Sequence, residues 1–256
     1  MVAPPLQSTI TWEKLPDDFV LPNDPVDNIN QPALAAALTE SLQLAQRLPD
    51  TAFTATNYGI CATLNQKFVV KAPDWVYVPA ITVPRSDVVR SYTPHLQGAI
   101  PSIVLEFLSE TEGGEYSSKA SYPPGKFFFY EQIVQVPNYG IFEPDSGRLE
   151  LHRFDDQKRY KLQTPNPEGR FWIPEMQLFL GVWQGLREGR DGYWLRWWDQ
   201  SETLLLWGTE WVDQERQRTD QERQRAEQEH QRAEQEHQRA ERLMAQLRAA
   251  GLEPES

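Results

Sequence analysis

The sequence contains one cysteine, Cys61, among 256 residues. A single cysteine excludes an intrachain disulfide and a zinc site built on cysteine ligands, and it fits a reducing, cytoplasmic setting. Long apolar runs are also missing. No stretch approaches the roughly 18 uninterrupted apolar residues that a membrane-spanning helix needs. The opening segment, MVAPPLQSTITWEKLPDDF, lacks the basic and apolar blocks of a signal peptide. The sequence therefore predicts a cytoplasmic protein without a membrane segment.

Basic residues are in the minority. The chain has 25 Lys and Arg against 37 Asp and Glu, which gives a formal net charge of −12. This balance argues against a protein that coats nucleic acid nonspecifically, because such binding depends on clustered Lys and Arg. It does not exclude an enzyme that acts on phosphodiesters through a bound metal, where carboxylates are the working groups.

Composition divides the chain into three parts. Prolines and acidic residues crowd residues 1–30, which we expect to form an irregular N-terminal arm. Residues 31–211 have the patterns of one domain, which opens with an amphipathic helix in QPALAAALTESLQLAQRL and continues with β-type segments. Residues 212–250 are a repeat of different character. The predicted fold class is mixed α/β (α+β) with a long C-terminal helix.

Within the domain, turn-forming residues between apolar segments predict three hairpins: NYGIFEPDSGRLELHRF, YKLQTPNPEGRFWIP and GYWLRWWDQSETLLLWG. The segment KFFFYEQIVQV fits a helix and a strand about equally well by its apolar periodicity. Several tryptophans near the end of the domain are expected to close a hydrophobic lid over the sheet rather than to stack on bases: Trp194, Trp197, Trp198 and Trp207.

The C-terminal repeat has a period of seven residues, as in DQERQRT, DQERQRA and EQEHQRA. A Gln-, Glu- and Arg-rich segment without Pro or Gly favours continuous helix, and the period of seven suggests a coiled coil. The apolar stripe is thin, since it has one apolar position per heptad: Ala226, Ala233, Ala240 and Leu247. Two interpretations stay open, a coiled coil that makes a homo-oligomer and a single solvated helix supported by pairs such as Arg225–Glu229.

The segment IPSIVLEFLSE has the pattern of a buried strand, yet it carries a carboxylate, Glu106, in its middle. Burial of an unpaired carboxylate costs several kcal/mol, so Glu106 needs a partner. A second acid, Asp74, begins the strand-like stretch APDWVYVP. If the two strands are neighbours, the acids face each other and repel unless a divalent cation lies between them. A Mg²⁺ ion held by Asp74 and Glu106 is one interpretation, and two ordinary strand-end acids are the other.

The order of segments resembles the bacterial Uma-type putative restriction endonucleases of the PD-(D/E)XK nuclease superfamily. The shared pattern is a Pro-Asp strand, a Glu in an apolar strand ending in Leu-Ser, and Lys126 four residues before Tyr130. A Val-Pro-x-Tyr strand at 136–139, an acidic-Pro turn at 143–144 and a hairpin follow. The resemblance covers roughly residues 31–185.

This resemblance implies a mixed, mainly four-stranded core sheet flanked by helices, and Mg²⁺-dependent hydrolysis of DNA phosphodiester bonds, with Mn²⁺ able to substitute. It implies that Asp74 and Glu106 are metal ligands and catalytic residues, and that Lys126 assists the attacking water. The usual superfamily spacing puts this lysine two residues after the Glu, where Leu108 stands, so Lys126 is a displaced substitute with Lys71 and Lys119 as rivals. The chain also departs from the family in a longer polar loop after Glu106 and in its heptad tail. These departures leave open a catalytically inactive scaffold that oligomerises through the tail.

Overall fold

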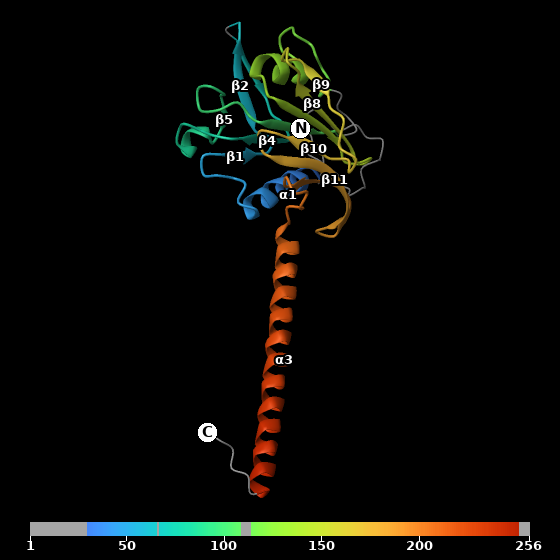
Figure 1. Ribbon diagram of the computed structural model, residues 1–256. Helices are drawn as coiled ribbons and strands as arrows, with labels where there is room; N and C mark the ends of the chain where they lie inside the picture. Colours follow the sequence, from blue (N-terminus) through green and yellow to red (C-terminus); the bar gives the residue numbers. More distant parts are fainter. Residues whose placement is uncertain (1–29, 66, 109–113, 251–256) are drawn as a thin grey trace, which may run out of the picture.

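The computed structural model describes residues 30–65, 67–108 and 114–250. It contains a mixed α+β domain and one long helix, α3 (Gly208–Ala249), that stands away from the domain like a stalk (Figure 1). This confirms the predicted fold class. The arm expected over residues 1–30 lies outside the described residues, except for Asn30, which begins helix α1 (Asn30–Leu44).

The central sheet has six strands in the order β1-β4-β6-β7-β8-β9. The strands are β1 (Phe53–Ala55), β4 (Trp75–Val78), β6 (Ile103–Phe107), β7 (Asn138–Glu143), β8 (Arg148–Phe154) and β9 (Tyr160–Leu162). Strands β6 and β7 run parallel, and the other neighbours are antiparallel. The sheet is therefore mixed, as expected, with β1 and β9 added beyond the four-stranded core.

Parallel strands need a crossover connection, and KFFFYEQIVQV supplies part of it. The segment is helical, with α2 (Lys126–Phe128) continuing into the wider turns of η2 (Phe129–Val134). The helical conformation is favoured over a strand because it buries Phe129, Tyr130 and Val134 together in the core that covers the sheet. Gln135 ends the segment in the left-handed conformation, at φ 60°.

Two smaller sheets complete the domain. One has the order β3-β2-β5, with β2 (Gly59–Leu64), β3 (Lys67–Lys71) and β5 (Ser91–Tyr92), and a short helical turn, η1 (Arg85–Val88), precedes β5. The other has the order β10-β11-β12, with β10 (Phe171–Ile173), β11 (Leu178–Arg187) and β12 (Arg190–Trp198).

The three predicted hairpins have different outcomes. The first is confirmed, because β7 and β8 pair from Asn138–Arg153 to Glu143–Arg148. The second is wrong: β9 pairs with β8 in the central sheet, whereas β10 pairs with β11 in another sheet. The third is right only at its turn, because β12 pairs chiefly with β11 and the returning chain makes one isolated bridge, Trp198–Leu204.

Strand alternation sends side chains to two hydrophobic cores. Trp75, Tyr77 and Leu105 face a core shared with α1 and the β10–β12 sheet. Val76 and Val104 face a second core shared with η2 and the β2–β3 hairpin. Three of the four tryptophans expected to form a lid, Trp194, Trp197 and Trp207, are buried in the first core, whereas Trp198 lies outside that core, against Arg170. The two-residue alternation of side chains along a strand thus determines which core each strand residue faces.

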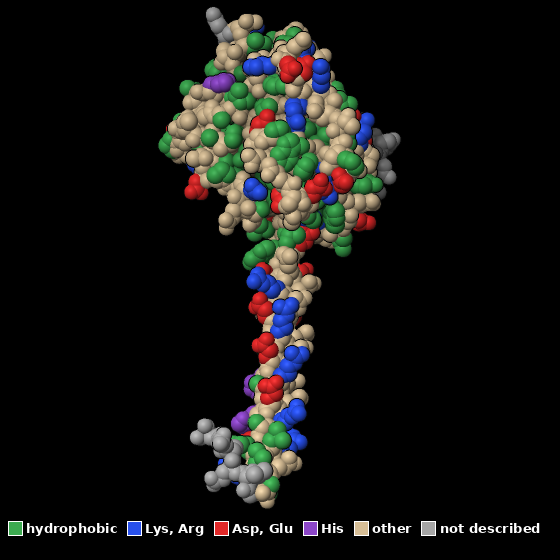
Figure 2. Space-filling view, viewed as in Figure 1, with side chains coloured by type: hydrophobic (Ala, Val, Ile, Leu, Met, Phe, Trp, Pro, Cys, Tyr) green, Lys and Arg blue, Asp and Glu red, His purple; other side chains and the backbone are tan. Residues whose placement is uncertain are grey.

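Within the described residues, helix α3 contacts the domain at its first turn. The buried guanidinium of Arg196 on β12 binds Glu210 in the first turn, with Nη2–Oε2 at 2.6 Å and Nη1–Oε1 at 3.0 Å. From Arg216 onward the helix residues are solvent-exposed, and Lys or Arg and Asp or Glu side chains intermingle along it (Figure 2). Among the described helices, none is long and apolar enough to cross a membrane.

Candidate active site

The register of β4 and β6 brings Asp74 and Glu106 together. Trp75 pairs with Leu105 in this antiparallel ladder, and one further step puts Asp74 opposite Glu106. Residues opposite each other in an antiparallel pair lie on the same side of the sheet. Oδ2 of Asp74 also accepts a hydrogen bond from the backbone N–H of Phe107 at 2.5 Å. Both acids thus lie on the side covered by α2 and η2.

Lys126, the first residue of α2, lies against Glu106. Its Nζ is 3.1 Å from Oε2 of Glu106 and 3.3 Å from Oε1 of Glu115. Glu106 is fully buried, and the ammonium group of Lys126 lies against the carboxylate for which the sequence left the partner open. Leu108, at the usual lysine position, packs against the second core instead.

The rival lysines also lie within the field of this site. Burial lowers the pKa of Lys71, and the positive charges of Lys126 and Lys119 lower it further, while Glu106 opposes them. Among the described contacts, the direct ammonium contact with Glu106 belongs to Lys126. The geometry therefore favours Lys126 over Lys71 and Lys119 as the residue nearest the acids.

Two buried tyrosines bind Glu106 and Glu115. The hydroxyl of Tyr130 donates to Oε1 of Glu106 at 3.2 Å, and that of Tyr139 donates to the backbone carbonyl of Glu115 at 2.9 Å. Tyr130 lies on η2 and Tyr139 on β7, so helix and sheet both orient the cluster. The sequence pattern contained Tyr130 and Tyr139 but gave neither a role.

Sequence reasoning missed Glu115. It lies in the polar loop before α2, yet only 2% of its surface is exposed. Within the described part of the chain, its buried Oε2 has no hydrogen-bond partner, while Oε1 contacts Lys126. A Glu in a stretch rich in Gly and Ser looks like an exposed loop residue, so no local signal marks it as part of the site.

The electrostatics of the cluster follow from burial. Burial raises the pKa of Glu106 to about 8, with Lys126 opposing the rise and Asp74 and Glu115 adding to it. For Lys126, burial lowers the pKa, but Glu106, Glu115 and Asp74 outweigh it and hold the pKa above the ordinary lysine value. A cation near Asp74 and Glu106 would favour the ionised form of both carboxyls.

The donor atoms fit a magnesium ion in type. They are the carboxylate oxygens of Asp74 and Glu106, with the unpartnered Oε2 of Glu115 nearby. Mg²⁺ takes oxygen ligands and is usually held by one or two carboxylates while it keeps several waters. Across the described ranges, no three His, Cys, Asp or Glu side chains are grouped closely enough to hold an ion. A two-carboxylate Mg²⁺ site fits these residues, and a cage built wholly from protein ligands does not.

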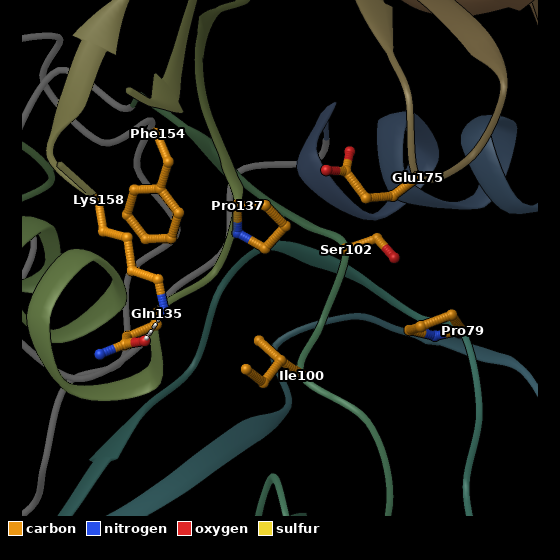
Figure 3. Close-up of a pocket in the computed structure, with 8 residues that line it drawn as sticks. All are labelled: Pro79, Ile100, Ser102, Gln135, Pro137, Phe154, Lys158 and Glu175. Carbon is orange, nitrogen blue, oxygen red and sulfur yellow. Dashed lines mark hydrogen bonds between the residues drawn. The ribbon is translucent and has the colours of Figure 1, made fainter. Parts of the chain in front are cut away.

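A cavity of about 400 Å³ lies at the other ends of the same strands (Figure 3). Ser102 and Pro137, which precede β6 and β7, line it, as do Lys158 and Glu175. The carboxylate of Glu175 is engaged, since it accepts a hydrogen bond from Nδ2 of Asn138 at 2.7 Å. Because Glu106 is near the opposite end of β6, this cavity is separate from the acidic cluster.

Comparison with known proteins identifies the family of the chain. No curated protein matches the chain. A family model described as "Uma2: Putative restriction endonuclease" matches residues 15–187, which is more than half of the chain and includes Asp74, Glu106 and Lys126. The chain belongs to the Uma2 family of putative restriction endonucleases.

Proposed function

We propose that this protein is a Mg²⁺-dependent endonuclease that hydrolyses phosphodiester bonds in DNA. Asp74 and Glu106 hold the metal, and Lys126 assists the attack. The observation that carries the proposal is the distance of 3.1 Å between Nζ of Lys126 and Oε2 of Glu106, with Asp74 across the β4–β6 ladder. Three separate segments of the family pattern meet at this point.

In this proposal each side chain has a distinct task. A bound Mg²⁺ supplies charge neutralisation on the phosphate and acidifies a water, the two effects that phosphodiester hydrolysis needs most. Lys126 presents a permanent positive charge that orients water and offsets negative charge developing on the phosphate. Glu115 and Glu106 fix its ammonium group, and Tyr130 fixes Glu106. Glu106 and Glu115 are buried and Lys126 is partly buried, so electrostatic interactions among them are stronger than in water.

The family name supports DNA as the substrate. The net charge of −12 rules out strong attraction of DNA to the surface as a whole, so any affinity is local. Lys71, Lys119 and Lys126 provide that local positive charge, since each contributes to the field at this site.

Incubation of supercoiled plasmid DNA with Mn²⁺ or Mg²⁺ tests the proposal. We expect wild-type protein to nick or linearise the plasmid and Glu106→Gln to lose about a hundredfold or more of the rate. Glu222→Gln on the exposed part of α3 is the matched control and should retain wild-type activity. Equal activity in wild type and Glu106→Gln, or no cleavage by either, would contradict the proposal.

One observation favours a second candidate, a non-catalytic nuclease-fold protein that recruits partners. The ammonium group of Lys126 compensates the charge of Glu106 without any metal. The two candidates differ in metal binding, because a ligand that binds the folded state stabilises it. Under the nuclease proposal the melting temperature rises with Mg²⁺ or Mn²⁺, and Asp74→Asn removes that rise. A wild type whose melting temperature ignores both ions would favour the second candidate.

A further inference from the structure

We propose that Lys67, Lys71 and Lys119, together named the lysine rim, bind the backbone phosphates of duplex DNA on either side of the scissile phosphate. This inference rests on the proposed nuclease function and adds the surface that would hold the substrate. The lysine rim comes from two neighbouring segments, strand β3 and the loop at residues 114–125. Figure 1 shows the β2–β3 hairpin and the α2/η2 segment together at the end of the domain remote from α3.

The loop lies directly on strand β3. The hydroxyl of Tyr122 donates a hydrogen bond to the backbone carbonyl of Phe68 at 3.2 Å. Nζ of Lys67 lies 5.0 Å from the centre of the Tyr122 ring, a cation–π distance. These contacts make the hairpin and the loop one continuous surface.

Two lysines of the rim lie on the same side of β3. Lys67, Val69 and Lys71 share one side of β3, and Val69 is buried in the second core with residues of η2, whereas Phe68 and Val70 point to the other side. Side chains two residues apart in a strand lie on the same side, so Lys67 and Lys71 lie on the side facing the loop. Lys71 also comes three residues before Asp74, which ties the rim to the acidic cluster.

Lys119 is held beside the start of α2. Its backbone carbonyl accepts a hydrogen bond from the N–H of Gly125 at 2.9 Å. A side chain at position 125 would place Cβ 2.1 Å from the carbonyl oxygen of Ser117, so the close approach of loop and helix requires glycine. This packing brings the backbone of Lys119 against Gly125, the residue before Lys126.

The charges identify the ligand class. Lys71, Lys119 and Lys126 are close enough that the last two lower the pKa of the first, after the larger effect of burial. Repulsion among these lysines opposes folding, and the charge of Glu106 offsets it only in part. A polyanion that passes the acidic cluster would relieve this repulsion, and DNA phosphates are held in this way by Lys side chains.

An exposed aromatic ring borders the same surface. Tyr122, whose ring lies against Lys67, is 52% exposed. Aromatic faces of this kind stack on nucleotides or pack against sugars next to phosphate-binding lysines.

Fluorescence anisotropy with a labelled DNA duplex of about 20 base pairs tests the proposal, with salt titration to count phosphate contacts. The chain carries Glu106→Gln so that the duplex stays intact. We expect Lys67→Ala, Lys71→Ala and Lys119→Ala each to raise the dissociation constant about fivefold and to lower the salt slope by about one. Arg232→Ala on α3 is the matched control and should bind like the parent.

Lys71 is partly buried, so its Ala variant is paired with Lys71→Arg, which keeps the charge and should retain affinity and salt slope. In the active chain, Lys119→Ala should raise KM and leave kcat unchanged, which a role in loop stability alone would not produce. If the parent binds DNA and all three Ala variants bind equally well with the same slope, the lysine rim is refuted while the nuclease proposal stands. If wild type neither binds nor cleaves DNA, both proposals fall.

Discussion

Nζ of Lys126 lies 3.1 Å from Oε2 of Glu106, although 20 residues separate them in the chain. The lysine belongs to the crossover helix and the acid to the central strand, so their contact links two structural layers. The contact also places the positive charge of Lys126 directly on a fully buried carboxylate.

Lys126→Met is therefore expected to cost more stability at high pH than at low pH. Burial raises the pKa of Glu106 to about 8 from an ordinary value of 4.5, so between these values the folded chain keeps a proton that the unfolded chain releases. The stability of the wild type accordingly falls as the pH rises between these two values. Loss of Lys126 raises the pKa of Glu106 further. Each additional pKa unit lowers the free energy of unfolding by about 1.4 kcal/mol once the pH exceeds the new pKa.

Urea denaturation of Lys126→Met and wild type at about pH 6 and about pH 9 measures this difference. Lys158→Met, which removes an exposed lysine, is the control and should show little change at either pH. A cost that is independent of pH would show that Glu106 does not depend on Lys126.

Glu115→Gln should shift the pH dependence of stability to lower pH. The negative charge of Glu115 is one of the causes that raise the pKa of Glu106, so its removal allows Glu106 to ionise earlier. The measurement is the urea midpoint of each variant as a function of pH. In a Glu106→Gln background, Glu115→Gln should cause no further shift in the dependence of the urea midpoint on pH. A shift that persists there would assign the effect to another group.

Glu210→Ala should destabilise the domain by about 3 kcal/mol, because it leaves the fully buried Arg196 without its carboxylate. The guanidinium also lies 3.4 Å from the centre of the Trp207 ring, so it cannot easily reach water. Glu222→Ala breaks only an exposed pair with Arg218 and should cost less than about 0.5 kcal/mol. Chemical denaturation gives both values, and similar costs for the two variants would be inconsistent with a buried ion pair at the root of α3.

Removal of residues 216–256 should leave the unfolding of the domain unchanged. The helix residues from Arg216 onward are exposed, and the root contacts of Glu210 are retained. Calorimetry of the full and shortened chains checks this, and a lower melting temperature of the shortened chain would contradict it. Homo-oligomerisation through the heptads stays a prediction, which sedimentation velocity of the same two chains tests: the full chain should sediment as an oligomer and the shortened chain as a monomer.

The meeting of Asp74 and Glu106 was predictable from the sequence, because alternation in two short apolar strands fixes the side of each residue once the strands are neighbours. Lys126 was reached through the family pattern and not from physical reasoning alone. Glu115 could not be found, since the burial of a loop residue depends on how the loop folds over the sheet.

Strand partners were the least predictable part of the fold. The sequence predicts one hairpin from Tyr160–Leu162 and Phe171–Ile173. Instead, the first strand pairs with β8 and the second with β11. Phe171 and Ile173 are buried in the tryptophan-rich core, and this burial outweighs the local turn signal of Asn-Pro-Glu-Gly. Turn-forming residues indicate which neighbouring segments could pair. The actual strand partners depend on the apolar surface of segments distant in the sequence.

A lysine carried by the crossover between β6 and β7 is independent of the spacing along the acidic strand. Insertions or deletions in the connecting loop can move it in sequence without moving it in space. Searches that require a fixed interval between acid and lysine will therefore overlook relatives built like this one, and a search for a cation near the end of the acidic strand in three dimensions will recover them.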